Sequence, residues 1–83
     1  MAITGAQVRM ARAALKWTVQ DLAARAAISK NTVTAVEAEQ SETHATTLAA
    51  IERVLADEGV EFLSDPNGVG VRLLAKKRRR SKS

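Results

Sequence analysis

The apolar residues between positions 18 and 37 repeat with the spacing of two short amphipathic helices. The inward stripe consists of Leu22, Ala23, Ala26, Ile28, Val33 and Val36. The outward positions of the second segment carry polar or small residues, namely Lys30, Asn31, Thr34 and Ala35. The two segments meet at a hinge over residues 26–29. This pattern predicts two helices that cross steeply, with the first supporting the second.

Two more helices are predicted, one on each side of this pair. The first begins after Thr4 and ends near Leu15, and the last runs from residue 43 or 45 to Asp57. Each of the first three helices is preceded by a side chain that can accept a hydrogen bond from a first-turn amide. These N-cap residues are Thr4, Thr18 and Ser29. Gln7 and Asp21 follow two of them at the spacing of a capping box.

After Gly59 the apolar period changes to two, which is the period of a β-strand. Strands over 60–63 and 69–74, joined by a turn over 64–68, predict a hairpin. The last eight residues, KKRRRSKS, contain no apolar side chain and are expected to be disordered. The predicted fold class is mainly α: a compact bundle of four short helices containing a helix-turn-helix, then a C-terminal β-hairpin and a disordered basic tail. These parts are residues 1–58, 59–75 and 76–83.

Composition narrows the class of function. The 83-residue chain has a net charge of +4, but six of its 13 basic residues lie in the tail, so the rest has a net charge of −2. Cysteine is absent and His44 is the only histidine, so we expect no metal site and no cofactor. No segment approaches the ~20 apolar residues of a membrane span, and the N-terminus lacks a signal-peptide layout. We expect a cytoplasmic, nucleoid-associated protein that is not an enzyme.

The segment TVQDLAARAAISKNTVTAVE resembles the helix-turn-helix of the lambda-repressor/Cro-like (XRE) family. The family pattern reads roughly Thr/Ser-Gln-x-x-Leu-Ala-x-x-Ala-Gly-Val-Ser-x-x-Thr-Ile-x-x-Ile-Glu. The residues in register are Thr18, Leu22, Ala23, Ala26, Ile28, Ser29, Thr32, Val33, Val36 and Glu37. The resemblance covers roughly residues 4–57 and implies binding of duplex DNA, with the second helix of the pair in the major groove.

The resemblance also implies which residues contact DNA. Those on or near the base-reading surface are Ser29, Lys30, Asn31, Thr32, Thr34 and Ala35. The predicted phosphate donors are Thr18, Gln20, Thr43, His44 and Thr46, with Lys76, Lys77, Arg78, Arg79 and Arg80 of the tail. Asparagine can bind adenine, lysine can bind guanine, and alanine or threonine can contact the thymine methyl. The alternative is an ordinary solvated helix face.

Some positions are expected to be structural. The resemblance implies an ion pair between Arg12 and Glu37, which would neutralise an acid near DNA. The sequence departs from the family pattern at three positions: Val19 replaces a frequent phosphate-binding glutamine, Ala27 replaces the turn glycine, and Glu39 replaces the glycine after the recognition helix. If the φ angle of Ala27 is positive, it costs on the order of 1 kcal/mol. Trp17 is expected in the core rather than as a base-stacking platform.

The hairpin and the tail each allow several interpretations. The apolar hairpin could fold back on the helices, or it could form a two-fold dimer, and we favour the dimer. The predicted dimer contacts are Val60, Phe62, Val69, Val71 and Leu73. The tail could be a phosphate-binding arm, a solubilising run or a site for an acidic partner, and the arm is favoured.

The sequence thus favours sequence-specific binding of duplex DNA by a regulator, most simply a homodimeric repressor or autoregulator. A second hypothesis is an antitoxin or anti-activator that acts by binding a partner protein. A third is a nonspecific nucleoid protein, which only the tail favours. An enzyme is not expected, because the sequence offers no nucleophile–base or carboxylate-pair pattern.

Overall fold

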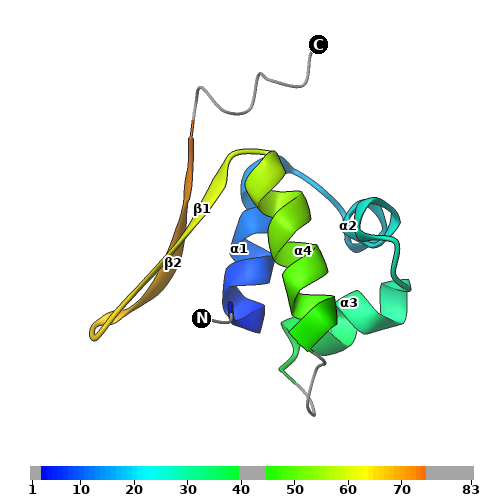
Figure 1. Ribbon diagram of the computed structural model, residues 1–83, viewed down its shortest axis with the longest axis horizontal. Helices are drawn as coiled ribbons and strands as arrows, with labels where there is room; N and C mark the ends of the chain where they lie inside the picture. Colours follow the sequence, from blue (N-terminus) through cyan, green and yellow to red (C-terminus); the bar gives the residue numbers. More distant parts are fainter. Residues whose placement is uncertain (1–2, 40–44, 75–83) are drawn as a thin grey trace.

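A computed structural model of the chain describes residues 3–39 and 45–74. The helices are α1 (Gly5–Leu15), α2 (Val19–Ala26), α3 (Lys30–Glu37) and α4 (Ala45–Asp57), and the strands are β1 (Val60–Asp65) and β2 (Gly68–Leu73). Figure 1 shows the hairpin on the opposite side of α1 and α4 from α2 and α3. The predicted class, a bundle of four short helices with a C-terminal hairpin, is confirmed. The tail lies outside the described residues.

The first two helices begin at capping boxes, as predicted. Thr4 Oγ1 accepts from the backbone N–H of Gln7 at 3.1 Å, and Gln7 Oε1 accepts from the Thr4 N–H at 2.9 Å. Thr18 and Asp21 repeat the arrangement, with distances of 3.0 and 2.8 Å. Each box satisfies two amide groups that have no partner inside the helix, so it fixes where the helix starts.

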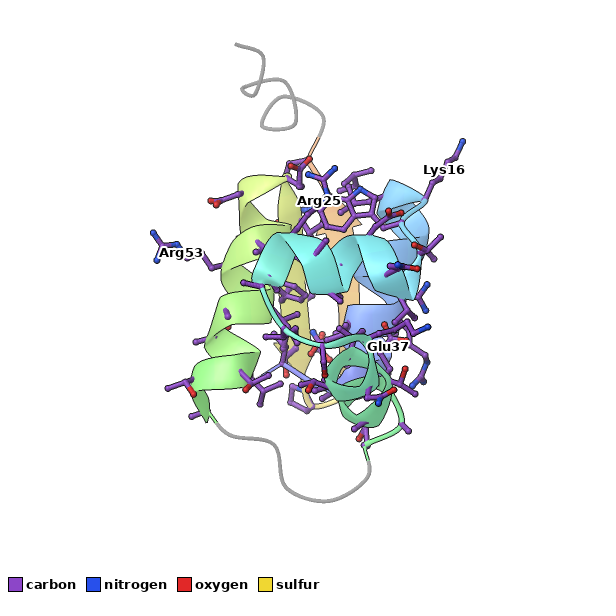
Figure 2. The ribbon with its side chains drawn as sticks, turned by 90° about the vertical axis from the view of Figure 1, so that its right-hand side faces the viewer. Lys16, Arg25, Glu37 and Arg53 are labelled. Carbon is purple, nitrogen blue, oxygen red and sulfur yellow. The ribbon has the colours of Figure 1, made fainter. Side chains whose placement is uncertain are left out.

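The turns that end α1 and α2 both depend on a left-handed residue. Lys16 has a φ of 61° and Ala27 has a φ of 59°, so the positive φ considered for Ala27 is present. The chain then turns back, and the Ile28 N–H donates to the Ala23 carbonyl at 3.0 Å. Figure 2 shows the result: α2 runs across the view while α3 is seen nearly end-on, so the two helices cross steeply as predicted.

A small aliphatic core connects the helix-turn-helix to the rest of the molecule. All four helices contribute a fully buried side chain, and the largest are Leu22, Ile51, Leu55, Val8 and Val33. Each such side chain stabilises the fold by about 1.5–3 kcal/mol relative to an exposed one. Trp17 is partly buried against this core, as predicted. The position of α3 is therefore set by packing on its inner face, while its outer face carries exposed side chains.

The hairpin folds back on the helices. Val60 pairs with Leu73 and Phe62 pairs with Val71, and all four side chains belong to the core or pack against it. Val60 is only 3% exposed, so it serves the chain's own core and is removed from the predicted dimer contacts. The inner face of the hairpin therefore packs on the chain's own helices, as in the fold-back alternative. Val69 remains exposed, at 41%.

The first strand is two residues longer than predicted, the second begins and ends one residue earlier, and the turn is shorter. Ser64 and Asp65 continue β1, and Asp65 pairs with Gly68, so only Pro66 and Asn67 form the turn. Asp65 Oδ1 accepts from the N–H groups of Asn67 and Gly68, at 2.7 and 3.1 Å. The short carboxylate takes the place of backbone partners and lets the chain reverse within two residues.

Gln7 ties the hairpin to α1. Its side chain is 2% exposed, and its Nε2 donates to the carbonyls of Leu63 and Gly70, at 2.9 and 3.0 Å. Together with its bond to Thr4, the amide is fully used, so it is buried without an unpaired polar group. The sequence predicts the capping bond of Gln7 but not this second role, because the partner carbonyls are more than 50 residues away.

Candidate nucleic-acid interface

The outer face of α3 begins with two polar side chains. Lys30 and Asn31 are exposed in its first turn, whereas Val33 and Val36 on the opposite face are 0% and 3% exposed. Ser29 caps the helix: its Oγ accepts from the Thr32 N–H at 3.1 Å and lies 2.8 Å from Thr32 Oγ1. The two hydroxyls at the helix start are therefore engaged in forming α3. The amine of Lys30 and the amide of Asn31 are the groups in this turn that can bind an external partner.

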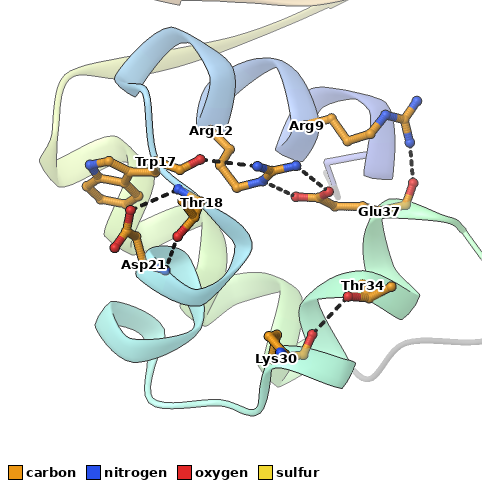
Figure 3. A network of polar contacts seen from close by, with 8 residues as sticks. All are labelled: Arg9, Arg12, Trp17, Thr18, Asp21, Lys30, Thr34 and Glu37. Atoms are coloured by element: carbon orange, nitrogen blue, oxygen red, sulfur yellow. Dashed lines mark hydrogen bonds and ion pairs between the residues drawn. The ribbon is translucent and has the colours of Figure 1, made fainter.

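The second turn of the same face presents small side chains. Thr34 is exposed and Ala35 is partly exposed. The Thr34 hydroxyl donates to the Lys30 carbonyl one turn back, at 3.1 Å (Figure 3). The helix face thus changes along its length from hydrogen-bonding groups to methyl groups.

An ion pair connects α1 to the end of α3. Arg12 Nε donates to Glu37 Oε2 at 2.8 Å and Arg12 Nη2 donates to Oε1 at 2.9 Å, so the contact is bidentate. The Glu37 side chain is 8% exposed and that of Arg12 is 22% exposed. The hydrogen bonds with Glu37 and its negative charge raise the pKa of Arg12 above its ordinary value, so this cation keeps its charge.

Two further contacts extend this network, as Figure 3 shows. Arg12 Nη1 donates to the Trp17 carbonyl at 3.1 Å, and Arg9 Nη1 donates to the backbone carbonyl of Glu37. Two arginines of α1 therefore hold the C-terminal end of α3, one through its carboxylate and one through its main chain. Because Arg12 neutralises the Glu37 carboxylate, α3 ends without an unpaired negative charge.

The first turn of α2 contains the carboxylate of Asp21, whose negative charge disfavours a contact with DNA phosphate there. Thr18 and Gln20 are exposed, but Thr18 is engaged with Asp21 through both bonds of the capping box. The N–H and hydroxyl of Thr18 lower the pKa of Asp21, so this carboxylate stays ionised at neutral pH. Val19, where the family often has a phosphate-binding glutamine, has no polar group in its side chain and packs against the core.

A comparison with protein-family models matches residues 8–58 to a helix-turn-helix family. The match covers more than half of the chain, and it includes all of α2, α3 and α4. The chain belongs to the XRE-type, lambda-repressor/Cro-like helix-turn-helix family. This family binds DNA and regulates transcription, and it is not a family of enzymes. A search of curated proteins found no match to the chain.

In a helix-turn-helix regulator α3 is the recognition helix, and the remaining predicted contacts can be placed around it. Thr46 is exposed in the first turn of α4. Thr43 and His44 of the preceding loop lie outside the described residues, as do the tail residues Lys76, Lys77, Arg78, Arg79 and Arg80. The DNA contacts of all these residues stay predictions.

The structure adds two basic side chains that sequence reasoning missed. Arg9 is one, and its contact with Glu37 joins segments 28 residues apart. Arg25 is the other, with its guanidinium 4.4 Å from the centre of the Trp17 ring. In this cation–π contact the Arg25 guanidinium lies over the Trp17 ring, and its positive charge is in the last turn of α2. Trp17 precedes α2 and Arg25 lies in its last turn, and a pair of residues eight apart in this way has no recognisable sequence signal.

Residues 3–39 and 45–74 contain no group of three metal-ligating side chains. Within the same residues, no helix is both long enough and apolar enough to cross a membrane.

Proposed function

We propose that the protein is a sequence-specific regulator that binds operator DNA as a homodimer and represses transcription, including that of its own gene. The observation that carries this proposal is the outer face of α3, where Lys30 and Asn31 are exposed and unencumbered by the capping bonds that engage Ser29 and Thr32. Lysine and asparagine are the side chains that bind guanine and adenine edges in the major groove. A cytoplasmic, nucleoid-associated location is part of the proposal.

The charge distribution supports this orientation. Asp57 is the last residue of α4 and Glu58 follows it, and Figure 1 places that end of the helix away from α3. Glu37, the acid at the end of α3, is neutralised by Arg12. The body of the protein can therefore approach phosphates with α3 leading, in spite of its net charge of −2 outside the tail.

The dimer is proposed because one recognition helix reads too few base pairs to give specific affinity alone. The hairpin still offers exposed apolar side chains for it: Leu63 is 39% and Val69 is 41% exposed. Leu63 belongs to β1 and Val69 to β2, and Figure 1 shows this hairpin on the opposite side of α1 and α4 from α2 and α3. Phe62, Val71 and Leu73 are partly buried against the chain's own core, so we expect the outer part of the hairpin to make most of the dimer contact.

The test is selection of bound duplexes from a randomised pool, followed by footprinting and by mass measurement in solution. We expect a defined two-fold site whose half-sites are centred about 34 Å apart, one turn of DNA, and a dimer mass at tens of micromolar protein. Equal affinity for unrelated duplexes would instead indicate a nonspecific nucleoid protein. A monomer that forms a stable complex with a small protein encoded by a neighbouring gene, and selects no duplex, would favour the antitoxin or anti-activator alternative.

A further inference from the structure

We infer that Thr34 reads a thymine through its methyl group and not through its hydroxyl. The inference rests on the proposed function and names a specificity-determining residue within it. The first turn of α3 presents the hydrogen-bonding groups of Lys30 and Asn31, so the base pairs next to it are read by polar contacts. The second turn presents Thr34 beside Ala35, and here the structure decides which part of the threonine meets DNA.

The hydroxyl of Thr34 is turned back toward its own helix. Its hydrogen is donated to the Lys30 carbonyl at 3.1 Å, which is the common i to i−4 contact of threonine in helices (Figure 3). It therefore has no hydrogen left for the acceptor atoms of guanine or for O4 of thymine. Because the hydroxyl points back along the helix, the methyl group occupies a different position on Cβ and is available to an external partner.

The neighbouring residues favour an apolar contact at this position. Ala35 follows Thr34 on the same face, and Ala38, one turn beyond Thr34, is exposed. None of these side chains can donate to a base once the Thr34 hydroxyl is engaged. The C5 methyl of thymine is the apolar feature that the major groove displays, and alanine and threonine methyl groups are its usual protein contacts.

A threonine hydroxyl that donates its hydrogen can still accept one, so the competing contact is with the amino group of adenine or cytosine. Two substitutions separate these contacts. Thr34→Ser keeps the hydroxyl and removes the methyl group, whereas Thr34→Val keeps a methyl group and removes the hydroxyl. Both changes are at an exposed position, so each variant is expected to keep the fold of the parent.

The experiment uses the duplex that the full-length parent protein selects from a randomised pool. Each thymine is replaced in turn by deoxyuridine, which lacks only the C5 methyl group, and affinity is measured for the parent, Thr34→Ser and Thr34→Val. Burying one methyl group stabilises a contact by about 0.8 kcal/mol, which corresponds to about a fourfold loss of affinity per half-site. We expect this loss at one thymine per half-site for the parent and for Thr34→Val, and no loss for Thr34→Ser.

Thr47→Ser is the matched control, because it removes a methyl group from a partly exposed threonine of α4 to which no DNA contact is assigned. It should keep the full response to deoxyuridine. The inference is overturned if no thymine in a well-defined site responds, or if Thr34→Ser responds like the parent. It is also overturned if Thr34→Val alone loses affinity while deoxyuridine has no effect, since that result shows an accepting hydroxyl. Failure to select any duplex would overturn the proposed function itself, which is a different outcome.

Discussion

Gly5 shows how one residue without a side chain positions the recognition helix. It lies at the first position of α1, directly against the C-terminal end of α3. A Cβ atom built on Gly5 would clash with the Val36 carbonyl and would lie 2.6 Å from Glu39 Cγ and 2.9 Å from the Glu37 carbonyl. Two of these neighbours are backbone atoms, which cannot rotate away. The absence of a side chain is therefore what permits α1 and α3 to approach so closely.

Gly5→Ala is expected to destabilise the protein by about 1–3 kcal/mol, the usual range for overpacking, even though alanine is the better helix former. The free energy of unfolding in urea is the measurement. Gly70→Ala is the matched control, because a Cβ there would meet no atom within 4 Å, and it should change stability by less than about 0.5 kcal/mol. Equal stability of the two variants would mean that the approach of α1 to α3 is looser than described.

Glu39 explains one departure from the family pattern. It has a φ of 52°, in the left-handed region where the family usually has glycine. Its Oε2 accepts from the Ala6 N–H at 3.2 Å, so its carboxylate caps the start of α1. A negative charge at a helix N-terminus is favourable, and this contact offsets part of the backbone cost of about 1 kcal/mol. The sequence shows the departure but not the compensation, which depends on two segments 33 residues apart.

At the scale of single elements, α2 depends on the capping box of Thr18 and Asp21. The hydrogen bonds from Thr18 lower the pKa of Asp21, so its ionised form is favoured in the folded state. A group with a lowered pKa stabilises the fold above its ordinary pKa of 3.8, and this stabilisation disappears as the pH falls through its folded-state pKa.

We therefore expect Asp21→Asn to be less stable than the parent at pH 6, because the charge at the helix N-terminus is removed. The difference should narrow as the pH falls below about 4, where the parent loses the same charge. The measurement is urea unfolding of both proteins at a series of pH values from about 2.5 to 6, which spans the titration of the carboxyl group. A difference in stability that stays constant over this range would show that the charge of Asp21 contributes nothing to the capping box.

The helices can be predicted from sequence because their signals are local. Thr4, Thr18 and Ser29 mark the helix starts through bonds that span three residues, and the apolar spacing fixes the buried faces. The threonines and valines of α3 are poor helix formers, yet Val33 and Val36 are buried and packing holds the helix. The hairpin is predictable as an element, but its packing is not. Whether its apolar face meets the chain's own helices depends on long-range contacts such as those of Gln7.

In the candidate site, too, some features can be predicted from the sequence and others cannot. The exposed positions of α3 follow from helical periodicity, and the family resemblance correctly pairs Arg12 with Glu37. Sequence alone cannot show that the hydroxyls of Ser29, Thr32 and Thr34 are engaged within the helix. Hydrogen bonds select one of several side-chain rotamers that the sequence allows, so only the structure shows which hydroxyls on the outer face of α3 are already engaged.

At the scale of the whole molecule, the basic charge is concentrated in the tail. Six of the 13 basic residues lie in residues 76–83, and the rest of the chain has a net charge of −2. We expect removal of the tail to weaken binding to selected and unrelated duplexes by similar factors, since phosphate contacts carry no sequence information. Removing one phosphate contact lowers the slope of log K against log salt by about 0.9, so a drop of roughly 2–6 is expected for a dimer.

A chain whose tail keeps its length but has serine in place of the six basic residues is the matched control for this salt titration. It should behave like the truncated protein. An unchanged slope would show that the tail makes no phosphate contacts. A changed ranking of duplex sequences would show that it reads bases or groove width instead.

The most direct test of the proposed function is the ratio between affinity for the selected duplex and affinity for a scrambled duplex. This ratio should be measured for the parent and for Lys30→Ala, Asn31→Ala and Arg53→Ala. Arg53 is an exposed basic residue of α4, so its removal changes the charge as Lys30→Ala does but leaves α3 intact (Figure 2). We expect each α3 variant to lose about 1–3 kcal/mol of binding to the selected duplex and little binding to the scrambled one. Arg53→Ala should keep the parent's ratio. If both α3 variants also keep it, the outer face of α3 does not read DNA.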